Sequence, residues 1–192
     1  MDDPIDKFNT LWEQALLDTP LKQKSAVCVS TINEDGFPES RFVDLKSVSK
    51  CGLVFCTYLD SNKGDDIRRD PKVSLALWWD HIGIQIRAVG VAQQISEEEA
   101  IKYWQTRSRD AQLTTMCFNQ SKPLSSESEL ISKFDDIKEQ MAGNIVPKPK
   151  NWGGYIIKPL SIEFLTFKEN RLHLRELYKN ADGQWSKMLL QP

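Results

Sequence analysis

The sequence predicts a mainly β protein of the α+β class, in which an antiparallel sheet or small barrel carries flanking helices. Short runs rich in β-branched and apolar residues recur along the chain, and most are joined by turn sequences. Asn33-Glu34-Asp35-Gly36 is a strong hairpin signal, since Asp-Gly supplies a positive φ at low cost. The chain has 192 residues, 40% of them hydrophobic, which is enough apolar material for one core.

Apolar residues at helical spacing predict a first helix over Ile5–Asp18, which Thr19-Pro20 ends. A second turn is expected at Cys51-Gly52, and a short polar helix at Asp65–Arg69. The strands of the first half are expected at Ala26–Ile32, Ser40–Leu45, Leu53–Tyr58, Val73–Trp79 and Ile82–Val91.

Two further helices begin with capping-box spacing, a serine followed three residues later by glutamate. One starts at Ser96 and is expected to run to about Arg107, and the other starts at Ser126 and stops at Gly143. Residues 146–150 form a stiff, proline-containing connector. The closing strands are expected at Tyr155–Ile157, Ser161–Phe167, Leu172–Tyr178 and Trp185–Leu190.

Composition and charge exclude several classes of function. The chain has 25 Lys+Arg against 27 Asp+Glu, a balance that argues against general binding to nucleic acid or acidic membranes. The longest apolar stretch, Leu75–Trp79, is too short to span a bilayer. The acidic N-terminus lacks the features of a signal peptide, so we expect a cytoplasmic protein.

Four cysteines without a CxxC pair and only two histidines leave no pattern typical of a metal centre. We therefore expect no bound metal, and we expect buried free thiols at the cysteines, most of which lie in strand-like runs. The sequence contains neither a phosphate-binding P-loop nor a Rossmann glycine turn.

Several cations stand where they could bind an anion, although each has a purely structural alternative. Arg41 and Lys46 bracket one strand with opposite parity, so serving one site requires a bulge; otherwise they are solvated charges. Lys63 lies just before the short helix, where open N–H groups favour an anion, although a capped surface turn would look the same. Tyr103 and Arg107 lie four residues apart and, on one helix face, could grip a phosphate. They could equally be a core residue and a charge at a helix end.

The densest group is Arg171, His173 and Arg175, which a regular strand would place on one face, with Leu172 and Leu174 on the other. Three such groups need an anion among them, which either a ligand or a structural carboxylate such as Glu163 or Glu176 would supply. Gln85 lies within an apolar strand, so we expect a buried amide that needs partners from the backbone or from a bound heterocycle.

Taken together in sequence order, these stretches resemble the pyridoxine/pyridoxamine 5'-phosphate oxidase family. Each motif is weak alone, but their order and spacing hold from about Ser25 to the last residue. The stretches are Arg41–Lys46, Ser61–Gly64, Gln85, Lys102–Arg109, Asn119–Ser121, Trp152–Tyr155, Ile162–Phe164, Arg171–Arg175 and the ending Leu190–Pro192.

The resemblance implies an antiparallel six-stranded FMN-binding split barrel with flanking helices, acting as a homodimer with FMN in two clefts at the subunit interface. It implies one domain over 1–192, with an N-terminal helix at 5–18, a barrel core at 25–120 and a C-terminal oxidase-type segment at 150–192.

The resemblance also assigns roles to residues of this chain. The implied cofactor-binding residues are Arg41, Lys46, Thr57, Lys63, Gln85, Gln120, Ser121 and Arg175. The implied substrate-binding residues are Lys46, Tyr103 and Arg107 for the phosphate of the vitamin, and Arg171 with His173, which count as the catalytic residues, over its pyridine ring.

The implied reaction oxidises pyridoxine or pyridoxamine 5'-phosphate to pyridoxal 5'-phosphate, with O2 as acceptor and H2O2 as product. Because the flavin carries the redox chemistry, the protein needs no obvious nucleophile or acid/base pair. Four positions depart from the family pattern: Asn62, Ala111, Leu165 and Leu174. They keep open a related FMN-dependent oxidoreductase with another substrate, such as a phenazine-pathway-like oxidase or a flavin reductase. A third alternative, which does not depend on these positions, is a module that binds flavin or pyridoxal phosphate without turnover.

Overall fold

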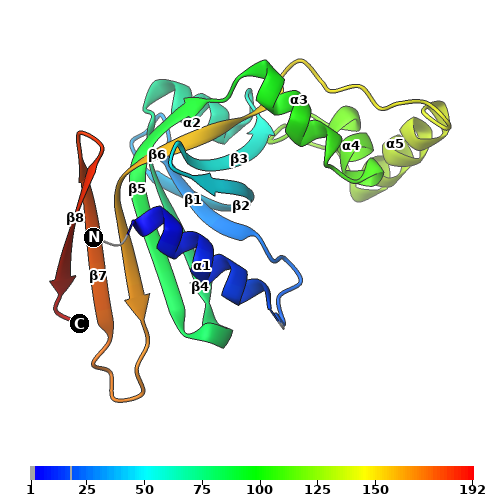
Figure 1. Cartoon of the computed structure of the whole chain (residues 1–192). Coiled ribbons are helices and arrows are strands. Elements are labelled where there is room, and N and C mark those ends of the chain that lie inside the picture. Colours follow the sequence, from blue (N-terminus) through cyan, green and yellow to red (C-terminus); the bar gives the residue numbers. More distant parts are fainter. Residues whose placement is uncertain (1–2, 18) are drawn as a thin grey trace.

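The computed structural model describes residues 3–17 and 19–192, and its central feature is an antiparallel β-barrel (Figure 1). The strands follow the order β3-β2-β1-β4-β5-β6-β7-β8, and an additional β3–β6 pairing closes the first six into a barrel. This confirms the predicted fold class. The strands are β1 (Ala26–Ile32), β2 (Pro38–Ser49), β3 (Gly52–Tyr58), β4 (Lys72–Trp79), β5 (Ile84–Gln94), β6 (Trp152–Thr166), β7 (Leu174–Ala181) and β8 (Gln184–Leu190).

Both predicted turns in the first half of the chain are confirmed. β1 and β2 pair antiparallel across the Asn33–Gly36 turn, in which Gly36 has a φ of 84°. The Asn33 side chain accepts hydrogen bonds from the backbone N–H groups of Asp35 and Phe37, so the turn is held by its own asparagine. The second turn, between β2 and β3, depends on Gly52 with a φ of 140°.

Strand β6 corrects the prediction of two separate strands over Tyr155–Ile157 and Ser161–Phe167. It is continuous and pairs with β5 along its length, although the register shifts between Val89 and Gly90, opposite Pro159. Its first half also pairs with β3 and its second half with β7. Since a barrel strand comes from the C-terminal segment, the barrel core extends beyond the predicted 25–120.

The helix α1 (Pro4–Leu16) packs on the main core, which fills the barrel. Asp3 caps its first turn by accepting a hydrogen bond from the N–H of Ile5 at 2.8 Å. Phe8 is fully buried, and its ring makes an edge contact with Trp79 at a centroid distance of 6.1 Å. The predicted end of this helix, Asp18, lies outside the described residues.

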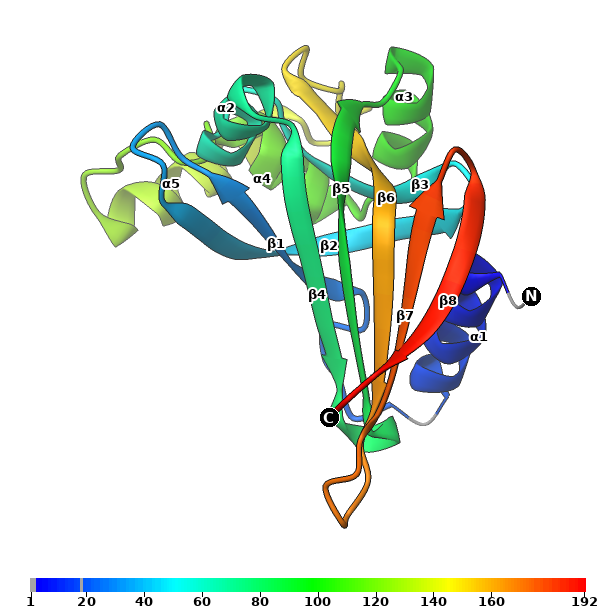
Figure 2. The ribbon, with the colours of Figure 1, turned by 90° about the vertical axis from the view of Figure 1, so that its left-hand side faces the viewer.

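The other helices gather around one end of the barrel, as Figures 1 and 2 show. They are α2 (Asn62–Arg69), α3 (Glu97–Gln105), α4 (Arg109–Cys117) and α5 (Glu127–Gln140). A short 3-10 turn, η1 (Asp80–Ile82), is separate from them and connects β4 to β5. The Ser96 capping box is present, but α3 ends before Arg107, and α4 was not predicted. No residue of α5 is buried, so the predicted apolar stripe there only partly covers its neighbours.

The expectation of buried thiols is wrong. Cys51 is exposed and Cys28, Cys56 and Cys117 are half-buried, all as free cysteines. In the described part of the chain, no group of three or more His, Cys, Asp or Glu side chains is placed to hold a metal ion. Within the same ranges, no helix has the length and apolar character needed to cross a membrane.

Closure of the barrel makes a stability prediction at two adjacent glycines of β6. A Cβ at Gly154 would lie 2.4 Å from the carbonyl oxygen of Phe55 on β3, whereas a Cβ at Gly153 would meet only the Leu59 side chain, at 3.2 Å. We expect Gly154→Ala to lower the free energy of unfolding by about 1–3 kcal/mol, because backbone must move to relieve the overlap. Gly153→Ala should cost less, and urea unfolding of both variants checks the difference. Equal losses would contradict the role of the close β3–β6 approach.

Candidate functional site

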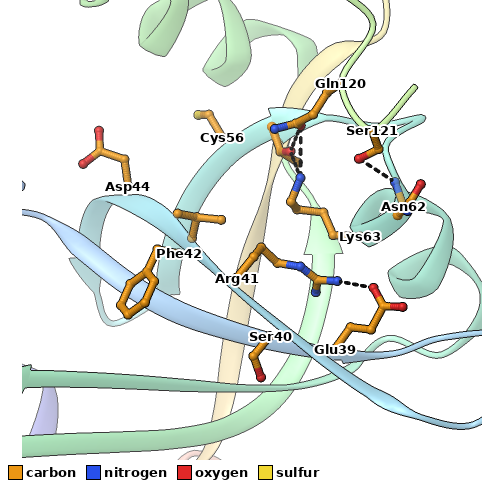
Figure 3. A pocket seen from close by; sticks show the side chains of 12 residues that line it. Glu39, Ser40, Arg41, Phe42, Asp44, Cys56, Asn62, Lys63, Gln120 and Ser121 are labelled. Carbon is orange, nitrogen blue, oxygen red and sulfur yellow. Dashed lines mark hydrogen bonds and ion pairs between the residues drawn. The ribbon is translucent and has the colours of Figure 1, made fainter. Parts of the chain in front are cut away.

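A polar cleft of about 540 Å³ lies where β2, β3 and the start of α2 meet the segment that follows α4 (Figure 3). That volume falls within the range of small-molecule sites. The lining residues are Glu39, Ser40, Arg41, Phe42, Val43, Asp44, Cys56, Thr57, Asn62, Lys63, Gln120 and Ser121. Five of the predicted cofactor residues are therefore brought together: Arg41, Thr57, Lys63, Gln120 and Ser121.

The ammonium group of Lys63 is the chemical centre of this cleft. The residue is only 5% exposed, and its Nζ donates to three neutral oxygens: Thr57 Oγ1 at 3.0 Å, Ser61 Oγ at 3.2 Å and Gln120 Oε1 at 3.0 Å. Thr57 donates in turn to Gln120 Oε1 at 3.0 Å. Among the described residues, no carboxylate lies within ion-pairing distance of Lys63, so its position is well fixed but its charge is not neutralised.

The pKa of Lys63 is lowered to about 8, mainly by burial and also by the nearby guanidinium of Arg41, while Asp66 opposes the shift. A lysine with such a pKa is held in a place that disfavours its own charge. An anion that enters the cleft would relieve this cost. The structure therefore has the property expected of an anion site, which a capped surface turn would not have.

Arg41 forms the second cationic wall, and a network between β1, β2 and α2 holds it. Its guanidinium donates to Thr31 Oγ1 at 2.5 Å and to Glu39 Oε2 at 3.1 Å, and it lies 3.7 Å from Asp66 Oδ2. Thr31 also donates to Asp66 at 2.7 Å. Thr31 and Asp66 are buried positioning residues that the sequence analysis missed. The available signal was the acidic Asp66 one helical turn after Lys63.

The far wall comes from the segment after α4. Ser121 has a left-handed φ of 71°, and its Oγ accepts a hydrogen bond at 3.5 Å from the N–H of Asn62, the first residue of α2. Donors from a lysine, an arginine, a serine and the first turn of a helix converge here. Such a set suits a phosphate group.

The predicted substrate-phosphate residues gather beside this cleft. The register between β2 and β3 shifts between Leu45 and Ser47, so Lys46 sits at the bulge that the sequence analysis required. Lys46 forms an ion pair with Asp44, which lines the cleft. Tyr103 shares a hydrogen bond of 2.9 Å with Ser47.

The prediction that Tyr103 and Arg107 share one helix face is wrong, because α3 ends at Gln105 and Arg107 lies in the following turn. Its guanidinium donates to Ala111 O and Thr115 Oγ1, both at 2.9 Å, and lies 5.3 Å from the Trp152 ring centroid. Burial lowers the pKa of Arg107, and its Nε has no hydrogen-bond partner among the described residues. Arg107 still lines a smaller adjoining pocket together with Cys56.

The prediction of one strand face for Arg171, His173 and Arg175 is wrong. Strand β7 begins only at Leu174, and Arg171 has a positive φ of 62° in the preceding loop. His173 Nδ1 accepts a hydrogen bond from the N–H of Lys168 at 3.1 Å. The bulky leucines of this segment, Leu172 and Leu174, are exposed rather than covering a core.

Arg175 pairs with Glu163, one of the two carboxylates that the sequence offered as structural partners. Its Nε lies 2.8 Å from Glu163 Oε1, and Glu163 also pairs with Arg87. Burial raises the pKa of Glu163, but the hydrogen bonds from Arg175 and Arg87 outweigh it, and the net pKa is lowered. Glu163 therefore remains charged at neutral pH and neutralises Arg175.

Gln85 is half-buried rather than buried, and it lies on the outer face of the sheet. The strand registers place it in one cross-strand row with Trp78, Leu165 and Arg175. Gln85 and Arg175, two of the predicted cofactor residues, therefore share a face of the sheet although neither lines the cleft.

The two groups of predicted residues lie far apart in one copy of the chain. Figures 1 and 2 place α2, which carries Lys63, at one end of the barrel and the loop between β6 and β7, which carries Arg171 and His173, at the other. A single copy thus contains an anion cleft and a separate cationic loop.

A six-stranded antiparallel barrel with a phosphate-type cleft defines a class of ligand-binding split barrels, and comparisons with known proteins identify the family. Residues 14–141 match the family described as "Pyridoxamine 5'-phosphate oxidase", and residues 152–192 match "Pyridoxine 5'-phosphate oxidase C-terminal dimerisation region".

Named relatives cover nearly the whole chain. The pyridoxine/pyridoxamine 5'-phosphate oxidase of Shewanella pealeana is 36% identical over 190 residues, covering 99% of this chain and 89% of its own length. That of Vibrio vulnificus is 39% identical over 183 residues, covering 95% and 86%.

Two solved structures share the fold. PhzG from Burkholderia lata 383, crystallised with tetrahydrophenazine-1-carboxylic acid, has a TM-score of 0.92 at 27% identity, covering 100% of this chain and 94% of that one. A pyridoxamine 5'-phosphate oxidase-related, FMN binding protein from Nostoc punctiforme has a TM-score of 0.81 at 20% identity, covering 100% of both chains. The chain belongs to the pyridoxamine 5'-phosphate oxidase family, and the prediction of an oxidoreductase of this family is confirmed.

The lowered pKa of Lys63 leads to a prediction about anion binding that can be tested without the cofactor. Sulfate stays dianionic in neutral and alkaline solution, so only the protein titrates. With a Lys63 pKa of about 8, we expect sulfate to bind about tenfold more weakly at pH 9 than at pH 7, because most of the ammonium is then deprotonated. Calorimetric titration measures the affinity. Lys63→Met should weaken binding and remove the pH dependence, whereas Lys158→Met, at an exposed lysine of β6, should change neither. A wild-type affinity that is flat with pH would contradict this assignment.

Proposed function

We propose that this chain is an FMN-dependent oxidase that converts pyridoxine and pyridoxamine 5'-phosphate to pyridoxal 5'-phosphate, using O2 and releasing H2O2. The observation that carries the proposal is the buried Lys63 ammonium, which neutral oxygens hold in a cleft of suitable size. Family membership narrows the reaction, because named relatives with this activity match almost the entire chain.

The cleft fits the phosphate end of FMN. Lys63 and Arg41 would neutralise its charge, Gln120 and Ser121 would contact the same end, and Thr57 would hold Lys63 in place. Gln85 and Arg175 would lie along the rest of the cofactor. When bound, FMN supplies the two-electron redox chemistry, with O2 as the final acceptor.

The protein's own groups bind and orient the substrate. Lys46, Tyr103 and Arg107 would hold the substrate phosphate next to the cleft, where Tyr103 is already fixed by Ser47. Arg171 and His173 would lie over the pyridine ring and keep the carbon to be oxidised in place. Oxidation of the alcohol forms the aldehyde directly, while oxidation of the amine is followed by hydrolysis that releases ammonia.

The arrangement supports a homodimer with shared sites. Lys63 and the Arg171–His173 loop lie at opposite ends of the barrel, so a site that uses both requires a second copy of the chain. Residues 152–192 match a family segment described as a dimerisation region. We place the enzyme in the cytoplasm, where its four free cysteines would stay reduced.

A second candidate is an oxidase of another substrate in the same cleft. The observation favouring it is the TM-score of 0.92 to PhzG, which was crystallised with a tricyclic carboxylic acid. Ala111 and Leu165, at two positions that depart from the family pattern, would be compatible with a different ligand.

Turnover decides between the two candidates. Purified protein supplied with FMN should convert both phosphorylated vitamers to pyridoxal 5'-phosphate and produce peroxide, as an aldehyde assay and a peroxidase-coupled assay would show. If neither vitamer is oxidised while a reduced tricyclic acid is, the second candidate is correct and the first is wrong.

Mixed dimers test the shared site. Lys63→Met and His173→Ala should each be nearly inactive alone, because one lacks the cofactor cation and the other a substrate residue. Hybrid dimers of the two contain one intact site, so an equal mixture should recover about a quarter of wild-type activity. Co-expression with two different tags gives the hybrid, and two differently tagged Lys63→Met copies serve as the control. No recovery in the hybrid would mean that each site is built within one copy.

A further inference from the structure

Asp44, the ion-pair partner of Lys46, has no part in the proposed chemistry, although it lines the cleft. Asp44 lines the cleft, and Lys46 follows two residues later on the same strand. Residues at this spacing project from one face of a strand, and the bulge beside Lys46 lies next to the pair. The Lys46 side chain is 20% exposed and that of Asp44 is 59% exposed, so the carboxylate faces the solvent side of the pair.

The thiol of Cys56 is affected by the charges of Asp44, Lys46 and Arg107. The pKa of Cys56 is raised to about 11, mainly by burial; Lys46 and Arg107 oppose the shift and Asp44 adds to it, so all three charges act on this one thiol. Cys56 lines both the main cleft and the smaller pocket of Arg107. In Figure 3, Asp44 and Cys56 lie on the side of the cleft away from Glu39 and Asn62.

The two lysines of the site therefore differ in their partners. Lys63 donates hydrogen bonds only to neutral oxygens, while the nearby carboxylates of Glu39 and Asp66 pair with Arg41. The corner of Lys46 and Arg107 contains a resident carboxylate, so two cations and one anion leave a single positive charge there. A phosphate monoester carries about 1.5–2 negative charges at pH 7, more than this corner can neutralise while Asp44 stays in place.

We propose that Asp44 is a specificity-determining residue, which competes with the substrate phosphate for the Lys46 ammonium. This inference rests on the proposed function, since it takes Lys46 as a substrate-phosphate ligand. A dianionic ligand must displace Asp44 from Lys46 or tolerate its charge nearby. An uncharged ligand of the same shape has no such conflict. Asp44 therefore reduces the difference in binding affinity between phosphorylated and unphosphorylated ligands.

The test compares two ligands that the enzyme cannot oxidise, 4-deoxypyridoxine 5'-phosphate and 4-deoxypyridoxine, on FMN-loaded protein by calorimetry. Asp44→Asn keeps the shape and removes the charge. It should bind the phosphorylated ligand about threefold to tenfold more tightly and leave the unphosphorylated one unchanged. Asp135→Asn makes the same charge change on exposed α5 and should alter neither affinity.

Three further measurements separate this role from a structural one. The gain should vanish in a Lys46→Met background, because Asp44 acts through that ammonium. It should also shrink as salt is raised, because exposed charges are screened. In steady-state assays, Asp44→Asn should lower KM for the phosphorylated substrate with little change in kcat.

Unchanged or weaker phosphate binding by a folded Asp44→Asn protein would overturn the inference. If that variant does not fold, as circular dichroism would reveal, Asp44→Ser removes the same charge and the same criterion applies. The outcomes also separate the two proposals. Wild-type protein that binds the phosphorylated ligand but oxidises neither vitamer contradicts the proposed function alone, whereas active enzyme without the Asp44→Asn gain contradicts this inference alone.

Discussion

A buried ammonium without a carboxylate partner is the constraint on which the functional site depends. Burying a charge costs free energy unless other groups compensate, and the Lys63 ammonium donates hydrogen bonds to three neutral oxygens only. The fold keeps it there because Thr57 on β3 and Ser61 before α2 are themselves rigidly placed. An incoming phosphate would supply the missing charge, so the cost in the free protein becomes affinity for the ligand.

The remaining charged groups fall into two sets: those that pair with each other within the protein, and those that face the cleft. Arg175 is neutralised by Glu163, and Glu176 is shared by Lys7 from α1 and Lys187 from β8, so these pairs hold the outer strands and the first helix together. Arg41 is held in part by Glu39 and Asp66 but still faces the cleft. Lys63 and Arg41, the two cations of the cleft, therefore keep positive charge available to a ligand at this end of the barrel.

Much of the fold could be read from local patterns. The Asn33–Gly36 turn, the β1 bounds and the Ser96 capping box were all predicted, because each depends on residues adjacent in the chain. The predictions failed where distant partners decide. Pro159 made β6 look like two strands, yet pairing with β5 and β3 keeps it continuous. The helix at Arg109–Cys117 was not predicted, because its apolar pattern is weak and its stability depends on contacts with distant parts of the chain.

The sequence alone determined the types and order of the candidate functional residues, including Arg41, Lys63, Tyr103 and Arg107, and this order indicated the family. Only the tertiary structure decided which of these meet. It joined Arg41, Lys63 and Gln120 from three separate segments and paired Arg175 with Glu163. It also put Arg171 and His173 at the opposite end of the barrel. The physical reason is that strand register and barrel closure set distances between residues far apart in the chain, and a local pattern carries no information about them.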